Sequence, residues 1–155
     1  MNESGNESAD QSGKHLWLIF MKSYRALREV DARSISASGL GLSDFAVLEM
    51  LLHKGPLPVN TVGRKVMLTS GSITTAIDRL EKKRLVRRQA CPNDRRITFV
   101  QLTASGRRII ERIFQVHAAQ LEKAFEPLSA TERTLLVTLL KKIGKHSESL
   151  LEPKR

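Results

Sequence analysis

The chain has 155 residues, which is enough for one ordinary domain with a substantial core. Lys and Arg outnumber Asp and Glu by 26 to 16, and the formal net charge of +10 favours a polyanionic partner. The single cysteine, Cys91, excludes an intramolecular disulfide framework, and no stretch approaches the roughly eighteen apolar residues of a membrane helix. We therefore expect a cytoplasmic protein without a membrane partner.

The positive charge is concentrated in one part of the chain. Residues 64 to 108 contain twelve Lys and Arg against Asp78, Glu81 and Asp94, a net charge of +9. A charge that serves only solubility would be spread along the sequence, whereas phosphate neutralisation needs it in one place. A basic surface without a function is the alternative, but the concentration indicates a nucleic-acid partner.

The first segment, residues 1–13, is polar and acidic, with the composition of a disordered tail and not of a signal peptide. From Lys14 to Val30 apolar residues recur at steps of three and four. This spacing predicts an amphipathic helix that ends near Arg33.

A connection and two helices are expected next. Residues 34–42 are rich in Ser and Gly and are predicted to be a connection. Ser43 can then cap a helix that stops at Gly55-Pro56. A short helix over 59–66 follows, and Pro58 is expected in its first turn.

The short helix and the one after it predict a helix-turn-helix. Thr69 or Ser70 can cap the second helix, which turns Ile73, Ile77 and Leu80 inward. Its outward positions are small or hydroxylated at the N-terminal end, with one cation further along, so the helix can approach a major groove closely. These outward residues are Ser70, Gly71, Ser72, Thr74, Thr75 and Arg79. Hydroxyl residues also cap ordinary helices, but the basic run DRLEKKRLVRR strengthens the assignment.

Two segments with strand character, 85–90 and 97–102, follow this helix. Together they predict a β-hairpin wing, whose tip can deliver Arg95 or Arg96 into a minor groove. Asp94 has two compatible roles there, as a turn-forming residue and as a carboxylate that holds an arginine.

Two long helices complete the chain. Thr103 or Ser105 opens the first, which ends at Pro127. Residues 129–132 have the spacing of a capping box, and the helix that they open carries a broad apolar stripe over 135–143. We expect the N- and C-terminal helices to form the dimerisation half of a homodimer, with a monomer and a folded-back bundle as the alternative.

The predicted fold is therefore mainly α with a small β-hairpin: a winged helix-turn-helix lobe plus a helical dimerisation lobe. We expect a single domain over 14–150. Within it, 43–103 is the winged helix-turn-helix, while 14–34 and 104–150 supply the dimerisation helices. Residues 151–155 are expected to be flexible.

Over residues 16–150 the chain resembles the multiple antibiotic resistance regulator (MarR) family of winged helix-turn-helix repressors. The most specific part spans 68–106, where LTSGSITTAIDRLEKKRLVRR is followed by DRRITFVQLTASG. Its Asp-x-Arg, then Leu-Thr and Gly, is similar to that family's wing signature. The resemblance implies a homodimer on double-stranded DNA with an inverted-repeat operator. It also places Asp94 and Arg96 at the signature positions, with Arg96 for the minor groove and Arg95 beside it.

One departure from the family pattern lies after the recognition helix, where Arg84 occupies a position that is commonly Gly. Such a glycine adopts the left-handed conformation that ends a helix, and a non-glycine residue there costs about 1 kcal/mol. The sequence therefore predicts either Arg84 at positive φ or an altered helix end.

The resemblance also implies an effector that releases the DNA, either a small molecule or an oxidant. Similar regulators with TSGSIT and CPNDRR segments respond to phenolic or quinone-like compounds. Such a ligand would fit a cleft between the dimer helices and the DNA-binding lobe, with Trp17, Phe20, Tyr24 and His53 as candidate walls. The alternative is that these side chains fill the core.

Cys91 is a candidate redox switch, because the neighbouring arginines favour the thiolate that oxidants attack. The alternative is that Cys91 is only a small packed residue of the strand. A redox switch that forms a disulfide would also need a resolving thiol from another subunit. A thiol enzyme would need a histidine beside Cys91, but the four histidines are scattered and no metal-ligand or nucleophile motif is present. We expect no enzyme, cofactor or metal. An architectural DNA-binding protein without an effector remains the other alternative.

Overall fold

The computed structural model describes residues 12–94 and 96–151, and the chain forms two compact units, residues 1–121 and 122–155. Most of the tail expected at 1–13 lies outside the described residues. The exceptions are Ser12, which caps the first helix by accepting a hydrogen bond from the His15 amide, and Gly13, with which that helix begins.

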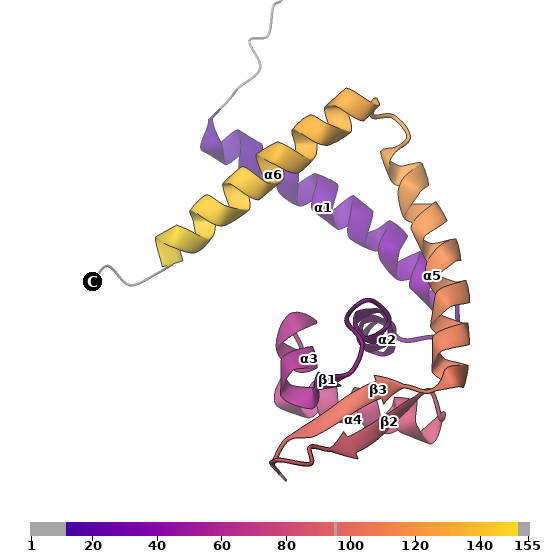
Figure 1. Ribbon diagram of the computed structural model, residues 1–155. Helices are drawn as coiled ribbons and strands as arrows, with labels where there is room; N and C mark the ends of the chain where they lie inside the picture. Colours follow the sequence, from indigo (N-terminus) through magenta and orange to yellow (C-terminus); the bar gives the residue numbers. More distant parts are fainter. Residues whose placement is uncertain (1–11, 95, 152–155) are drawn as a thin grey trace, which may run out of the picture. The chain divides into compact units, whose positions relative to one another are not determined.

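The first unit contains most of the secondary structure (Figure 1). Its helices are α1 (Gly13–Ser36), α2 (Leu42–Lys54), α3 (Val59–Lys65), α4 (Ser70–Lys82) and α5 (Ala104–Phe125), the last of which runs into the second unit. Its strands are β1 (Leu57–Pro58), β2 (Val86–Ala90) and β3 (Thr98–Leu102). The second unit adds α6 (Ala130–Leu151). In the described part of the chain, none of these helices has the length and apolar content that crossing a bilayer requires.

The connection after α1 is shorter than predicted. α1 continues to Ser36, so residues 34–36 are helical and only 37–41 form the turn. Ile35 is 4% exposed and belongs to the core, and this burial outweighs the weak helix propensity of the serines beside it.

α2 begins with Gly41 at its N-cap position, and the prediction that Ser43 caps it is wrong. Ser43 lies inside the first turn, where its hydroxyl accepts a hydrogen bond from Nη2 of Arg79 at 3.0 Å. The end of α2 was predicted correctly: Gly55 follows its last residue at φ 72°.

Pro58 lies immediately before α3 and not in its first turn, with φ −57° and ψ 139°. Together with Leu57 it forms β1, a strand that the sequence did not predict. β1 pairs antiparallel with β3, Leu57 opposite Val100 and Pro58 opposite Phe99. A strand of two residues is too short to leave an alternating pattern, so its signal is lost.

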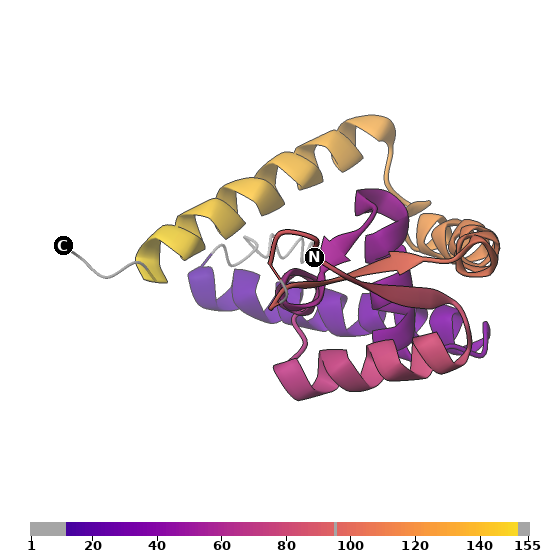
Figure 2. The same cartoon turned by 60° about the horizontal axis from the view of Figure 1, so that its bottom comes forward.

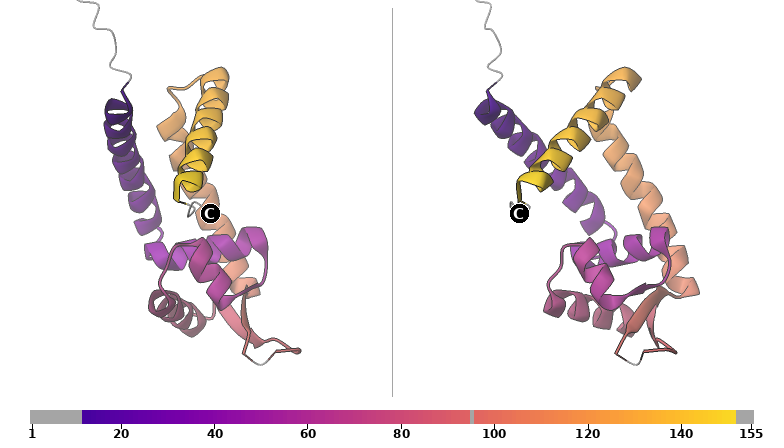
Figure 3. Two further views of the ribbon diagram at one scale, coloured as in Figure 1. Left: turned by 90° about the vertical axis from the view of Figure 1, so that its left-hand side faces the viewer. Right: turned by 60° about the vertical axis from the view of Figure 1, so that its left-hand side comes forward.

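β2 and β3 form the predicted hairpin wing, within a three-stranded sheet of order β1-β3-β2. Arg88 of β2 lies opposite Val100 of β3. In both views of Figure 3 the hairpin protrudes beyond α2, α3 and α4. Figure 2, which brings the bottom of Figure 1 forward, shows α4 and the hairpin together on the side toward the viewer.

The inward face of α4 is as predicted. Ile73, Ile77 and Leu80 are each at most 3% exposed, and they pack into a core formed with α2, α3, the sheet and α5. Burial of each such side chain stabilises the fold by roughly 1.5–3 kcal/mol. The other core residues include Phe45, Val47, Leu48, Leu51, Val62, Ala76, Val86, Val100 and Ile110. The opposite face of α4 is consequently turned to solvent.

The base of the hairpin is fastened to α5. The Thr103 amide donates to the Leu85 carbonyl oxygen at 3.0 Å, and the Thr103 hydroxyl donates to that of Arg84 at 2.8 Å. The same hydroxyl oxygen accepts from the Gly106 amide at 2.9 Å, so Thr103, and not Ser105, caps α5. A Cβ atom on Gly106 would lie 1.9 Å from the Leu85 oxygen, and this close approach explains the glycine of the LTASG segment.

Candidate nucleic-acid interface

The outward face of α4 presents a close-packed row of small polar side chains. The six residues predicted for it are all exposed: Ser70, Gly71, Ser72, Thr74, Thr75 and Arg79. Thr69 is the N-cap, and its side chain accepts a hydrogen bond from the Ser72 amide at 3.2 Å. The hydroxyls of Thr74 and Thr75 donate to backbone oxygens one turn earlier, each at 2.9 Å. These bonds use the hydroxyl protons and leave the oxygen lone pairs available, so this face can accept hydrogen bonds from base edges.

Arg79 is tied to a carboxylate that the sequence did not single out. Its Nη2 and Nε atoms donate to Oδ1 of Asp44 at 2.6 and 3.2 Å, and Lys83 Nζ lies 3.7 Å from Oδ2. The Asp44 hydrogen bond and negative charge raise the pKa of Arg79 above its ordinary value. Since Asp44 is 2% exposed, the pair holds α4 against α2. Arg79 therefore positions α4 as well as lying on its outward face.

Arg88 joins the wing to α4. Its Nη2 donates to Oδ1 of Asp78 at 2.6 Å and its Nη1 donates to Oε2 of Glu81. Its backbone amide also donates to Glu81, at 3.1 Å. Three bonds from one residue to two acids on successive turns hold the hairpin in a set position beside the helix. Arg88 belongs to the basic run and to the first strand segment, but the sequence did not indicate its bonds to Asp78 and Glu81.

At the wing tip Asp94 has both predicted roles. Its Oδ1 accepts from the Arg96 amide at 2.9 Å, which forms an Asx turn, and from Arg96 Nε at 3.2 Å. The amide hydrogen bond, followed by the guanidinium hydrogen bond, lowers the pKa of Asp94. The Arg96 side chain is nevertheless 91% exposed. Arg95 lies outside the described residues.

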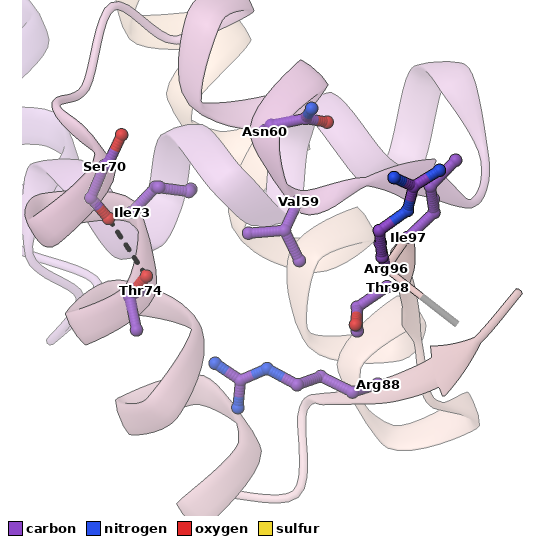
Figure 4. Close-up of a pocket in the computed structure, with 9 residues that line it drawn as sticks. All are labelled: Val59, Asn60, Ser70, Ile73, Thr74, Arg88, Arg96, Ile97 and Thr98. Carbon is purple, nitrogen blue, oxygen red and sulfur yellow. Dashed lines mark hydrogen bonds between the residues drawn. The ribbon is translucent and has the colours of Figure 1, made fainter. Parts of the chain in front are cut away.

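A hollow of about 380 Å³ separates the hairpin from α3 and α4 (Figure 4). In Figure 4 Arg88 extends from its strand toward the helix that carries Thr74. The lining residues are Val59, Asn60, Ser70, Ile73, Thr74, Arg88, Arg96, Ile97 and Thr98. Asn60 and Thr98 could not be predicted from the sequence, because they lie beside the α4 residues only in the folded chain. Cations, hydroxyls and an amide around an open hollow suit a sugar-phosphate chain.

The cations of the basic stretch fall into two groups. Arg79, Lys83, Arg88, Arg96 and Arg107 each pair with an acid. Arg64, Lys65, Lys82, Arg84, Arg87 and Arg108 have no acidic partner within the described ranges. The excess charge is thus largely uncompensated on the unit that carries α4 and the wing, as phosphate binding requires.

The four candidate ligand residues do not gather at one place. Trp17, Phe20 and Tyr24 lie in a row along α1, with successive ring centroids 6.2 and 6.3 Å apart. They are between 46% and 60% exposed, so the alternative that they fill the core is wrong for this chain alone. His53 instead packs edge-on against Phe114 of α5, with the centroids 4.9 Å apart.

Cys91 is half-buried at the start of the wing turn, and its amide donates to the Ile97 carbonyl oxygen at 2.9 Å. This bond continues the hairpin pairing past the end of β2. Within the described ranges no set of three or more His, Cys, Asp or Glu side chains is placed to hold a metal ion. Thiol sensing by Cys91 stays a prediction.

Comparison with known proteins agrees with this geometry. The model of the MarR family matches residues 40–98. The HTH-type transcriptional regulator MhqR of Bacillus subtilis is 40% identical over 129 residues, which are 83% of this chain and 89% of MhqR. A mutant MarR from E. coli, in a complex with operator DNA, superposes with a TM-score of 0.72 at 26% identity, covering 83% of this chain and 92% of that one. Bordetella bronchiseptica BpsR, whose DNA binding is regulated by 6-hydroxynicotinic acid, gives 0.72 at 25% identity, covering 83% and 98%.

Proposed function

Because the chain belongs to the MarR family of transcriptional regulators, we propose that it is a homodimeric repressor that leaves an inverted-repeat operator when an effector binds. Its relatives and structural neighbours are transcriptional regulators, in line with the expectation that it is not an enzyme. One observation carries the proposal: the polar face of α4 and the Arg96 side chain are both exposed. Arg88 holds the wing, which carries Arg96, beside α4.

The proposed DNA contacts divide between two grooves. α4 enters the major groove, where Ser70, Ser72, Thr74 and Thr75 read base edges and Gly71 allows a close approach. Arg96 enters the adjacent minor groove, and Asp94 holds its guanidinium ready for that contact. Arg95, beside it in the sequence, is also proposed as a DNA-binding residue.

A homodimer is proposed because the apolar stripe of α6 is exposed. Among the described residues of α6 none is buried, although Leu135, Leu139 and Ile143 are 56%, 46% and 61% exposed. An apolar stripe of this length on a helix is typical of an interface. Two-fold symmetry would then present two recognition helices to two half-sites about one DNA turn apart.

The proposed effector is a small phenolic or aromatic compound, with the row of Trp17, Phe20 and Tyr24 as the candidate contact and His53 as a separate one. An aromatic row with Arg28 6.0 Å from the Tyr24 ring centre suits a planar, anionic ligand. The regulation of BpsR by 6-hydroxynicotinic acid gives a precedent for such a compound. Release by an oxidant through Cys91 is the second possibility. We propose that the protein acts in the cytoplasm.

Selection of fragments from a random duplex pool by the purified full chain tests the proposal. We expect an enriched palindromic sequence whose half-site centres are one helical turn apart, and release of that duplex by simple phenols. Binding that depends on salt but not on sequence would contradict the proposal and support the architectural alternative. Cys91→Ser separates the two effector routes, because it should abolish release by oxidant and leave release by phenols unchanged.

Arg96→Ala tests the wing contact. Removal of a minor-groove arginine should weaken binding to the selected duplex by about 5- to 100-fold and relax the preference for A·T pairs under the wing. Fluorescence anisotropy at fixed salt measures both effects. Arg112→Ala removes an exposed cation from α5 and is the matched control, with little change expected. Equal affinity of Arg96→Ala and the parent would refute the wing assignment.

A further inference from the structure

The turn between α3 and α4 contains a residue in an unfavourable backbone conformation. Met67 has φ 53°, in the left-handed region. Its amide donates to the Arg64 carbonyl oxygen at 3.3 Å, and the Leu68 amide donates to that of Gly63 at 2.9 Å. These two bonds are those of a Schellman helix ending, in which the residue at the Met67 position is usually glycine.

The side chain of Met67 is not needed by the fold. It is 91% exposed, whereas its neighbours Val66 and Leu68 pack against the core. Methionine at this position therefore combines a strained backbone with an apolar side chain in water, and glycine would avoid both. What favours methionine must lie outside the chain.

The surroundings of Met67 indicate what that partner is. Arg64 and Lys65, in the last turn of α3, have no acidic partner in the part of the chain that the structure describes. On the other side Thr69 caps α4, whose N-terminal end carries the positive end of the helix dipole. An apolar side chain between two free cations and a helix N-terminus is complementary to DNA, which has phosphates on both sides of its apolar thymine methyl groups.

We propose that Met67 contacts the 5-methyl group of one thymine in each half-site, while Arg64 and Lys65 neutralise the flanking phosphates. The inference rests on the proposed DNA-binding function. It adds a base-reading residue that lies before the recognition helix and has no hydrogen-bonding group. The left-handed backbone turns the side chain away from the core and toward the groove wall.

The test uses the duplex selected by the full-length parent protein, with each thymine replaced in turn by deoxyuridine, which removes only the methyl group. We expect one replacement in each half-site to weaken binding about fourfold, the effect of losing one buried methyl group. Met67→Gly should bind the unmodified duplex more weakly than the parent does. It should bind the thymine duplex and the deoxyuridine duplex equally tightly. It should also raise the melting temperature of the free protein, because glycine relieves the strain.

Arg84→Gly is the matched control. It relieves the same left-handed strain at the other end of α4, so its melting temperature should rise while the fourfold ratio between the thymine and deoxyuridine duplexes stays. Met67→Leu, which keeps an apolar side chain, should retain part of that ratio.

Three outcomes would overturn the inference. The first is that the parent binds every deoxyuridine duplex as tightly as the thymine duplex. The second is that Met67→Gly keeps the full ratio between the thymine and deoxyuridine duplexes. The third is that Met67→Gly has a different oligomeric state from the parent, which would assign the side chain to a contact between subunits. Failure of the parent to enrich any sequence would instead overturn the proposed function, and the inference with it.

Discussion

At the scale of single residues, Asp94 determines the conformation of the wing tip. Its carboxylate holds both the backbone and the side chain of Arg96, and this explains an acid at the end of a basic hairpin. An unpaired acid would repel the DNA backbone, whereas here its charge is compensated by the residue that it orients.

The lowered pKa of Asp94 gives a prediction on pH. A carboxylate whose folded-state pKa is depressed stabilises the fold fully above its unfolded pKa, near 4, and loses that contribution as the pH falls through the lower folded value. We expect the Arg96 amide resonance to stay constant at neutral pH and to shift with a midpoint below pH 4. An NMR titration measures this.

Asp94→Asn is the control for this titration. The amide oxygen of Asn can still accept from the Arg96 backbone, so the turn should persist without the acid transition. A midpoint at or above the ordinary aspartate value in the parent would contradict the pairing.

At the same scale Arg84 has φ 58°, which is the first of the two outcomes that the sequence predicted. The Leu85 amide donates to the Leu80 oxygen at 2.9 Å and the Arg84 amide donates to that of Glu81 at 2.8 Å, which completes a Schellman ending on Arg84 itself. A family pattern with glycine at this position made the conformation foreseeable. Met67 has the same conformation, but it could not be predicted from the sequence, because no family pattern marks this position.

At the scale of elements the junction of β2, β3 and α5 depends on Gly106. Its α-carbon lies so close to the Leu85 carbonyl that any side chain would displace the strand or the helix. The Thr103 hydroxyl, which bonds to both sides of the junction, then fixes the direction in which the hairpin leaves the core.

Gly106→Ala should therefore destabilise the protein by about 3 kcal/mol or more, because the added methyl group collides with backbone and not with a flexible side chain. Chemical denaturation measures the free energy of unfolding. Ser105→Ala, one residue earlier in the same turn, is the control and should change it by no more than about 0.5 kcal/mol. A Gly106→Ala protein as stable as the parent would refute the close approach.

The sequence predicted the elements better than the contacts between them. Helix and strand periods depend on local spacing, so α4, the hairpin and the capping box at Ser129 and Glu132 were all foreseen. The Arg79–Asp44 and Arg88–Glu81 bonds join separate elements and leave no periodic signal. The position of Asp44 directly before the apolar residues Phe45 to Leu48 was the one available sign of its burial.

At the scale of the whole molecule the proposed dimer gives the next prediction. Leu139→Glu combined with Ile143→Glu places charges on the apolar stripe of α6 and should give a monomer by light scattering. Loss of the second half-site contact should then weaken operator binding by about a hundredfold or more.

Lys141→Glu is the control for the dimer prediction, since it changes charge on the side of α6 away from the stripe and should leave the dimer intact. A doubly substituted protein that remains dimeric would exclude α6 as the interface.

The bonds from Arg88 to Asp78 and Glu81 have a consequence for the genome that this protein reads. They hold α4 and the wing beside each other. In the proposed binding mode, the number of base pairs between the major-groove and minor-groove contacts of a half-site is therefore fixed. Mutation can change bases in an operator gradually, and each change weakens binding by a limited amount. A single inserted base pair moves one contact out of reach altogether, so functional sites should vary in sequence but not in internal spacing.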